Sequence, residues 1–286
     1  MFSLLCKKYL KIHNNDLNQN LKKLIEISDL LMNLEEDELN KGFWNITDKY
    51  KLDNDIINIK DKNNQFKTSF PINHLFTLLN NNLNFCINYT LIKNCRFCNE
   101  KKEDIIYLPS LIPISLNEIT DNNIKSKLLS LTSPYFTRCP KCSYLDDELL
   151  ITFEEYETCL NCISTQIKYP HFLIFYFDLG NDIDISVLED NRKNIANFIR
   201  ISFDINKKNY RLIGVINIPT NNHYTTTLIN YNNTINNVEL KGNFNYDDLN
   251  IPPILQKIEK NFDNDSELIN CICLNNIYIL LYEYED

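Results

Sequence analysis

The spacing of apolar residues changes between the first third of the chain and the rest. In the segment 17–34, leucine and isoleucine recur near helical spacing, Asp16 can cap the N-terminus, and Gln19 follows three residues later. Pro71 then opens a second apolar segment, 72–79. The pattern therefore predicts helices in the part of the chain before residue 85.

After this point the apolar residues form short runs rich in isoleucine, tyrosine and phenylalanine, which are typical of strands. These runs are 86–92, 105–116, 149–153, 172–177, 210–216, 223–229 and 277–284. Helices followed by a set of strands predict an α+β fold. No repeat of fixed period is present.

The composition excludes several classes of function. With 286 residues, 44% of them hydrophobic and 12% aromatic, the chain can bury a core. It has only 4 glycines and no glycine-rich phosphate-binding motif, so the common nucleotide-binding folds are excluded. The net charge of −9 and the lack of a long basic stretch argue against nucleic acid as a partner and favour a basic protein surface.

The apolar runs are too short to form a membrane-spanning segment or a signal peptide. The longest, 172–177 and 277–282, are far shorter than the ~20 residues that span a bilayer, and the apolar start at 1–5 is short for a signal peptide. Six of the 10 cysteines form Cys-x-x-Cys pairs, a spacing typical of metal or redox chemistry rather than a disulfide framework. We therefore expect no membrane partner and an intracellular location, cytoplasmic or nuclear.

The three Cys-x-x-Cys pairs are candidate zinc ligands. They are Cys95 with Cys98, Cys139 with Cys142, and Cys159 with Cys162. A tight turn can present two thiolates to one tetrahedral ion at about 2.3 Å, so two pairs complete a site. The middle pair can join either neighbour, and the remaining pair would be free thiols or would bind a second ion. Four sulfur ligands leave no open position, which predicts a structural zinc.

His223 is the histidine best placed for chemistry. His13, His74 and His171 suit surface or packing roles. His223 lies between two predicted strands, after the polar turn 219–222, where a loop can deliver it to a cleft, and Asp247 downstream offers a carboxylate. From these residues alone, an exposed loop histidine remains the simpler interpretation.

Several motifs, taken in their order, resemble the ubiquitin-specific protease family, papain-like cysteine hydrolases that cut after the C-terminal glycine of ubiquitin. Tyr-Arg-Leu-Ile-Gly-Val-Ile at 210–216 with Asn-His-Tyr at 222–224 resembles the family's tyrosine-led strand and its Gly-His-Tyr box. Phe-Asn-Tyr-Asp-Asp at 244–248 resembles its box of aromatic residues and two acids. The segments 169–177 and 276–283 resemble other palm strands, and Cys95/Cys98 and Cys139/Cys142 resemble the family's cysteine pairs.

This resemblance implies a single papain-like catalytic domain over 1–286. Its parts would be a helical thumb at 1–84, zinc-bearing fingers at 85–168 and a strand-rich palm at 169–286. His223 would be the general base and Asp247 the third member of the triad. The implied activity is thiol-dependent cleavage of the isopeptide bond after the last glycine of ubiquitin or a ubiquitin-like protein, which would be the partner.

The nucleophile is the point where the chain departs from the family pattern. Met-Phe-Ser-Leu-Leu-Cys at 1–6 resembles the end of the family's cysteine box, in a register that sets the catalytic cysteine two residues before Met1. Cys6 is the remaining candidate within the chain, although in this register we expect it to be a packed thiol. We expect Cys86, Cys271 and Cys273 to be buried in strands or at strand edges, and the chain as given to lack hydrolase activity. An inactive member that binds ubiquitin or another protein, and a zinc-ribbon interaction protein, are the alternatives.

Overall fold

The structure is a computed structural model of the chain. It describes residues 86–109, 111–119, 123–142, 158–178, 185–220, 223–235, 238–246, 255–258, 264–273 and 276–285. The helices predicted at 17–34 and 72–79 and the strand predicted at 149–153 lie outside these residues.

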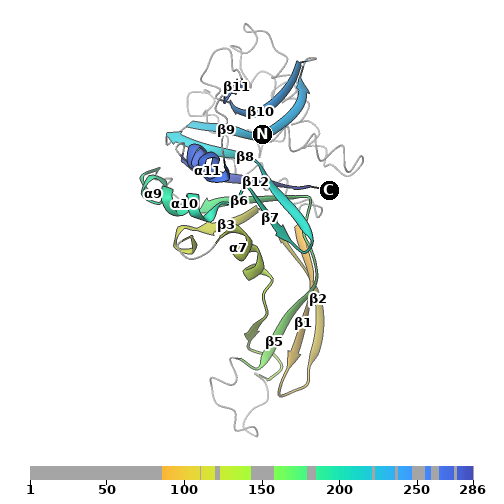
Figure 1. Cartoon of the computed structure of the whole chain (residues 1–286). Coiled ribbons are helices and arrows are strands. Elements are labelled where there is room, and N and C mark those ends of the chain that lie inside the picture. The colour runs from red at the N-terminus through yellow and green to blue at the C-terminus, as the bar shows by residue number, and fades with distance from the viewer. Residues whose placement is uncertain are drawn as a thin grey trace, which may run out of the picture.

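The strands form two sheets (Figure 1). The smaller sheet is antiparallel, in the order β2 (Lys101–Pro109), β1 (Cys86–Cys95), β5 (Leu160–Lys168) and β4 (Tyr135–Thr137). The larger sheet has the order β11 (Leu255–Lys257), β10 (Val238–Tyr246), β9 (His223–Ile235), β8 (Lys208–Thr220), β12 (Ile277–Glu285), β6 (Phe172–Asp178) and β3 (Leu111–Ser115). A short strand, β7 (Ser202–Ile205), also pairs with β8. The smaller sheet projects from the larger one as a long arm.

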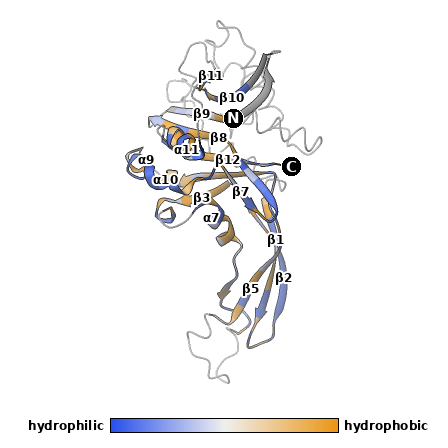
Figure 2. Cartoon of the chain, in the orientation of Figure 1, coloured by the Kyte–Doolittle hydropathy of each residue, from blue (hydrophilic) through white to orange (hydrophobic). Residues whose placement is uncertain are grey.

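Short helices pack against the larger sheet. They are α7 (Ile124–Leu131), α9 (Ile185–Asp190), α10 (Arg192–Phe198) and α11 (Asp265–Cys273). Ile195 and Phe198 of α10 and Ile272 of α11 share one core with Phe175 and Leu280 of the sheet. Hydrophobic positions accordingly gather in this region in Figure 2. The prediction of mainly strands after residue 85 is confirmed for the described residues, and the four α-helices among them, which the sequence analysis did not name, are short, with 6 to 9 residues each.

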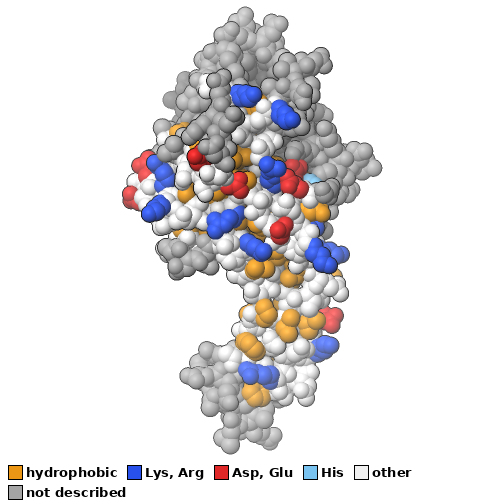
Figure 3. All heavy atoms as spheres, in the orientation of Figure 1, with side chains coloured by type: hydrophobic (Ala, Val, Ile, Leu, Met, Phe, Trp, Pro, Cys, Tyr) orange, Lys and Arg blue, Asp and Glu red, His pale blue; other side chains and the backbone are white. Residues whose placement is uncertain are grey.

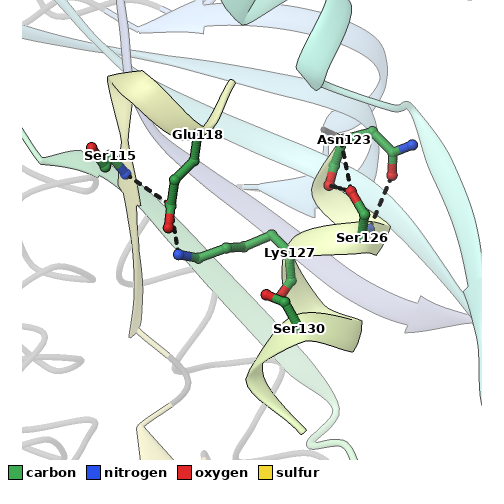
Figure 4. Close-up of polar contacts among 6 residues, drawn as sticks. All are labelled: Ser115, Glu118, Asn123, Ser126, Lys127 and Ser130. Carbon is green, nitrogen blue, oxygen red and sulfur yellow. Dashed lines mark hydrogen bonds and ion pairs between the residues drawn. The ribbon is translucent and has the colours of Figure 1, made fainter. Parts of the chain in front are cut away.

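The N-terminus of α7 is fixed by side-chain hydrogen bonds (Figure 4). Asn123 Oδ1 accepts hydrogen bonds from the backbone N–H groups of Lys125 and Ser126, at 3.0 and 3.1 Å. The Asn123 N–H in turn donates to Ser126 Oγ at 2.8 Å, which completes a capping box. Lys127 Nζ lies 2.6 Å from Glu118 Oε2 and so connects α7 to the preceding 3-10 turn, Leu116–Glu118. These contacts set Ile124 and Leu128, both fully buried, into the core.

The smaller sheet exposes hydrophobic side chains along one face, in the arm at the bottom of Figure 3. Ile105 and Tyr107 of β2 are 66% and 49% exposed, and Ile163 of β5 is 37% exposed. The strand registers pair Ile105 with Thr90 and Ile163 with Ile92 of the central strand β1, so these side chains lie on the same face. Exposed apolar side chains on one face are typical of a surface that contacts another protein.

Candidate functional site

Four cysteine sulfurs meet at the end of the smaller sheet. The Sγ atoms of Cys95, Cys98, Cys139 and Cys142 all lie within 4.8 Å of one another. The Cys95 and Cys142 sulfurs are 3.2 Å apart, and those of Cys98 and Cys139 are 3.8 Å apart. A tetrahedral zinc ion with 2.3 Å bonds separates its sulfur ligands by about 3.8 Å. The donor set and its spacing therefore fit a structural zinc ion.

Backbone hydrogen bonds hold the first cysteine turn in place. Cys95 ends β1, and its N–H donates to the carbonyl of Glu100 at 2.9 Å, which closes the turn. The Arg96 N–H donates to the carbonyl of Cys159 at 3.0 Å, and the Arg96 guanidinium donates to the carbonyl of Thr158 at 2.6 Å. The turn that carries Cys95 and Cys98 is thus anchored to the residues that lead into β5.

Opposing influences act on the sulfur of Cys95. Burial raises the pKa of this thiol, but N–H groups of Cys98 and Phe97 and the neighbouring thiols of Cys142 and Cys98 hydrogen-bond to the sulfur and lower it, to about 6. A sulfur that already accepts N–H hydrogen bonds is suited to bind a cation as a thiolate.

The turn that carries Cys139 and Cys142 is connected to the turn that carries Cys95 and Cys98 by an ion pair, because Lys141 Nζ lies 2.7 Å from Glu100 Oε2.

The third cysteine pair does not join the four-thiol group. Cys159 Sγ accepts a hydrogen bond from the N–H of Cys139 at 3.2 Å, and its side chain is fully buried. Cys162 lies within β5, where it pairs with Lys93 and Tyr135. The turn predicted for this pair was wrong, because an extended strand separates residues three positions apart by about 10 Å. The middle pair therefore meets the first pair rather than the third.

The backbone sets His223 at one end of the larger sheet. His223 begins β9 and faces Thr220, the last residue of β8. β10 ends at Tyr246, which pairs with Thr226 of β9, and β12 begins at Ile277, which pairs with Asn217 of β8. The start of β9, the end of β10 and the start of β12 therefore lie at the same end. The His223 side chain, Asp247, His13, His74 and Cys6 lie outside what the structure describes.

Two groups of side chains at this end were not found from the sequence. Tyr224 and Tyr278 form a ring contact with centroids 6.3 Å apart, and burial raises the pKa of Tyr278 to about 12. Asn217 Nδ2 donates to Thr227 Oγ1 at 3.0 Å, and Thr227 Oγ1 donates to Asn245 Oδ1 at 2.8 Å. A polar residue between apolar ones in a strand, such as Asn217, is a sequence signal for a buried polar side chain, but it does not identify the partners of that side chain.

Two further described cysteines, Cys86 and Cys273, are poor nucleophiles. Burial raises the pKa of Cys86 in β1, and it raises that of Cys273 to about 12 although Arg192 nearby lowers it. Cys271 and Cys273 lie in α11, not in strands as expected, because the apolar positions of 265–273 follow helical spacing.

His171 lies near a carboxylate, with its Nε2 3.4 Å from Glu283 Oε1 and both side chains mostly buried.

Comparisons with known proteins give structural neighbours only. No family model matches the sequence, and no curated protein matches it. Among the residues that the structure describes, no helix is long and apolar enough to cross a membrane.

Solved structures that are similar to this chain include a DUB module and a pseudoubiquitin hydrolase module. One is the SAGA Ubp8/Sgf11/Sus1/Sgf73 DUB module bound to ubiquitin aldehyde, with 13% identity, a TM-score of 0.35, and coverage of 71% of this chain and 42% of that chain. Another is the Saccharomyces cerevisiae Pan2 pseudoubiquitin hydrolase–RNA exonuclease module, with 12% identity, a TM-score of 0.40, and coverage of 74% of this chain and 36% of that one. The chain thus spans less than half the length of these proteins, and at this identity the similarity concerns the course of the backbone.

Proposed function

We propose that the chain is a ubiquitin-hydrolase-like protein that binds the C-terminal tail of ubiquitin or a ubiquitin-like protein at the sheet end where β9 begins. The observation that carries the proposal is the adjacency of two strand ends: β9 starts at His223, and the neighbouring antiparallel strand β10 ends at Tyr246, the residue before Asp247 in the sequence. Antiparallel neighbours bring the start of one strand beside the end of the other. A histidine and a carboxylate at such a junction are the parts that thiol activation requires.

In the proposed reaction, the His223 ring first takes up a proton and then donates it to the leaving group. The imidazole takes the proton of a cysteine thiol, and the thiolate attacks the carbonyl carbon of the terminal glycine. The C–N bond to the lysine amine then breaks, and the imidazolium returns the proton to the leaving nitrogen. Water, deprotonated by the same ring, hydrolyses the thioester. Asp247 would hold the ring orientation and stabilise its charged form.

Most of the described cysteines are unsuited to supply the thiol for this step. Cys86 and Cys273 have raised pKa values through burial, and Cys95, Cys98, Cys139 and Cys142 belong to the four-thiol group. Cys6 is the candidate that the sequence names within the chain. In this proposal zinc, bound by the four thiols, stabilises the arm and takes no part in the reaction, since a four-sulfur site has no open position.

The surface suits a protein partner. The net charge of −9 favours a partner segment with basic residues, and the exposed Ile105, Tyr107 and Ile163 offer an apolar contact face on the arm. The same surface would serve a member that binds without catalysis.

The experiment treats the full chain with ubiquitin that carries a C-terminal electrophile, and measures binding of unmodified ubiquitin in parallel. Labelling that is lost in His223→Ala and retained in His171→Ala supports the hydrolase, and peptide mapping of the adduct names the thiol. Cys6→Ser shows directly whether that thiol is Cys6.

Two other outcomes separate the alternatives. Binding without labelling supports the inactive, ubiquitin-binding protein. If the folded chain neither binds nor reacts with ubiquitin, and His223→Ala changes no interaction, the proposal is wrong and the zinc-ribbon interaction protein is favoured.

A further inference from the structure

Three polar side chains form a continuous hydrogen-bonded line across adjacent strands of the larger sheet. Asn217 of β8 donates to Thr227 of β9, and Thr227 donates to Asn245 of β10, over 3.0 and 2.8 Å. We call these three residues the amide track. Asn217 is fully buried and Thr227 is 2% exposed, whereas Asn245 is partly exposed. The track therefore runs from the interior of the sheet towards its β10 side.

The amide track lies close in the chain to both motif residues. Thr227 follows His223 by four positions on β9, and Asn245 precedes Asp247 by two positions on β10. Thr227 and Asn245 are direct partners in the β9–β10 register, and Asn217 is paired with Thr225, two residues from His223. The track thus connects, through side chains, the strand segments that lead to His223 and to Asp247.

Packing and stability do not account for Asn217. Its Oδ1 atom is buried and has no hydrogen-bond partner among the described residues. An aliphatic side chain at this position, like those of Val215 and Ile277 near it in the sheet, would leave no unmet acceptor. The Asn217 side chain is a buried amide beside a candidate site, and its oxygen has no hydrogen-bond partner among the described residues. We therefore interpret Asn217 as a residue that supports the site rather than the core.

We propose that the amide track is a positioning device for the His223–Asp247 pair, and this inference rests on the proposed function. Strand pairing holds the end of β10 from both sides, since Asn245 and Tyr246 pair with β9 and with β11. This pairing sets the spacing of the strands, whereas a side-chain hydrogen bond also restrains the orientation of the side chains on one face. The Thr227 hydroxyl, which both accepts and donates, restrains Asn245 and with it the approach of Asp247 to the ring. The three residues carry no charge, so they do not compete with the carboxylate for the imidazolium.

The test is an NMR titration of the His223 ring in the full chain, which requires no turnover. His223→Gln assigns the resonance among the four histidines. In the wild type we expect a pKa about 1 unit or more above the ordinary value of about 6.5, with the increase lost in Asp247→Asn. Thr227→Val, which removes the hydroxyl but keeps the shape, is expected to remove at least half of that increase. Thr227→Ser should restore it.

The matched control is Thr226→Val. Thr226 is a partly buried neighbour whose side chain points to the opposite face of β9, so this variant should titrate as the wild type. If Thr227→Val does not fold, Asn245→Ala breaks the same line at its partly exposed end and should give the same loss.

The two proposals fail in different ways. A wild-type pKa near 6.5 that Asp247→Asn does not change contradicts the His223–Asp247 pair itself. A raised pKa that Asp247→Asn lowers, but that folded Thr227→Val and Asn245→Ala leave unchanged, overturns the positioning role alone.

Discussion

The sulfur atoms of Cys95 and Cys142 lie 3.2 Å apart although 47 positions separate the two residues. Strand pairing explains the contact: β5 lies between β1 and β4, so the chain that continues from β4 to Cys139 and Cys142 returns to the end of β1 where Cys95 lies. The shorter separation, 16 residues between Cys142 and Cys159, does not give a shared site. Sheet order, which spacing alone does not reveal, decides which pairs meet.

The four-thiol group leads to a prediction about metal content. We expect the purified full chain to contain about one equivalent of zinc, measured by elemental analysis, because a closed four-sulfur site is normally filled. Cys142→Ser should reduce this content strongly and lower the melting temperature, since metal binding supplies folding free energy to the turns around it.

Cys159→Ser is the control for the metal prediction. Cys159 is buried beside the group and accepts the Cys139 N–H, but its sulfur is outside the four. The variant should keep its zinc. Folded wild-type protein with less than about half an equivalent would contradict the site.

Four of the eight strands of the larger sheet were predicted from the sequence, whereas β7, β10 and β11 were not. The runs at 172–177, 210–216, 223–229 and 277–284 correspond to β6, β8, β9 and β12. Nearly continuous apolar runs such as 172–177 favour strands buried on both faces. The prediction of a single strand at 105–116 was wrong. It divides into β2 and β3, which belong to different sheets, and Pro109 and Pro113 lie within it.

The site was predictable only in part. The four cysteines that meet were among the six candidates, and His223 begins a strand as its position between two runs indicated. The amide track could not be predicted, because Asn217, Thr227 and Asn245 come from three strands and become partners only through the register. Long-range pairing of this kind leaves no local pattern.

The cap of α7 should contribute measurably to stability. We expect Asn123→Ala to lower the free energy of unfolding by about 1 kcal/mol, because it leaves the N–H groups of Lys125 and Ser126 without their side-chain acceptor. Lys125→Ala, an exposed change in the same helix, should have little effect. Chemical denaturation of both variants measures the difference, and equal stabilities would show that the cap contributes nothing.

Asp104 gives a prediction about pH. Hydrogen bonds from Lys93 at 2.8 Å and from Lys102 at 3.1 Å lower the pKa of this carboxyl group. A lowered pKa in the folded state stabilises the protein above the unfolded value of about 3.9, and this contribution disappears as the pH falls through the folded pKa. An NMR titration should show a midpoint below about 3.9. Lys93→Met should move the midpoint up, and Lys101→Met should not.

Removal of zinc should loosen the arm before it affects the larger sheet. The two cysteine turns contact the rest of the smaller sheet through Arg96 with Thr158 and Cys159 and through the hydrogen bond from Cys139 to Cys159. Their buried thiols pack in the separate core of this sheet, beside Tyr89, Leu91 and Leu160. The core of the larger sheet contains none of the four thiols. A chelator should therefore increase amide hydrogen exchange, measured by mass spectrometry, at 95–99, 139–142 and 158–160, while β6 and β12 stay protected. Cys142→Ser without chelator should reproduce this exchange pattern. Equal loss of protection in β6 and β12 would mean that the two sheets unfold as one cooperative unit, and the zinc would then stabilise the whole described structure rather than the arm.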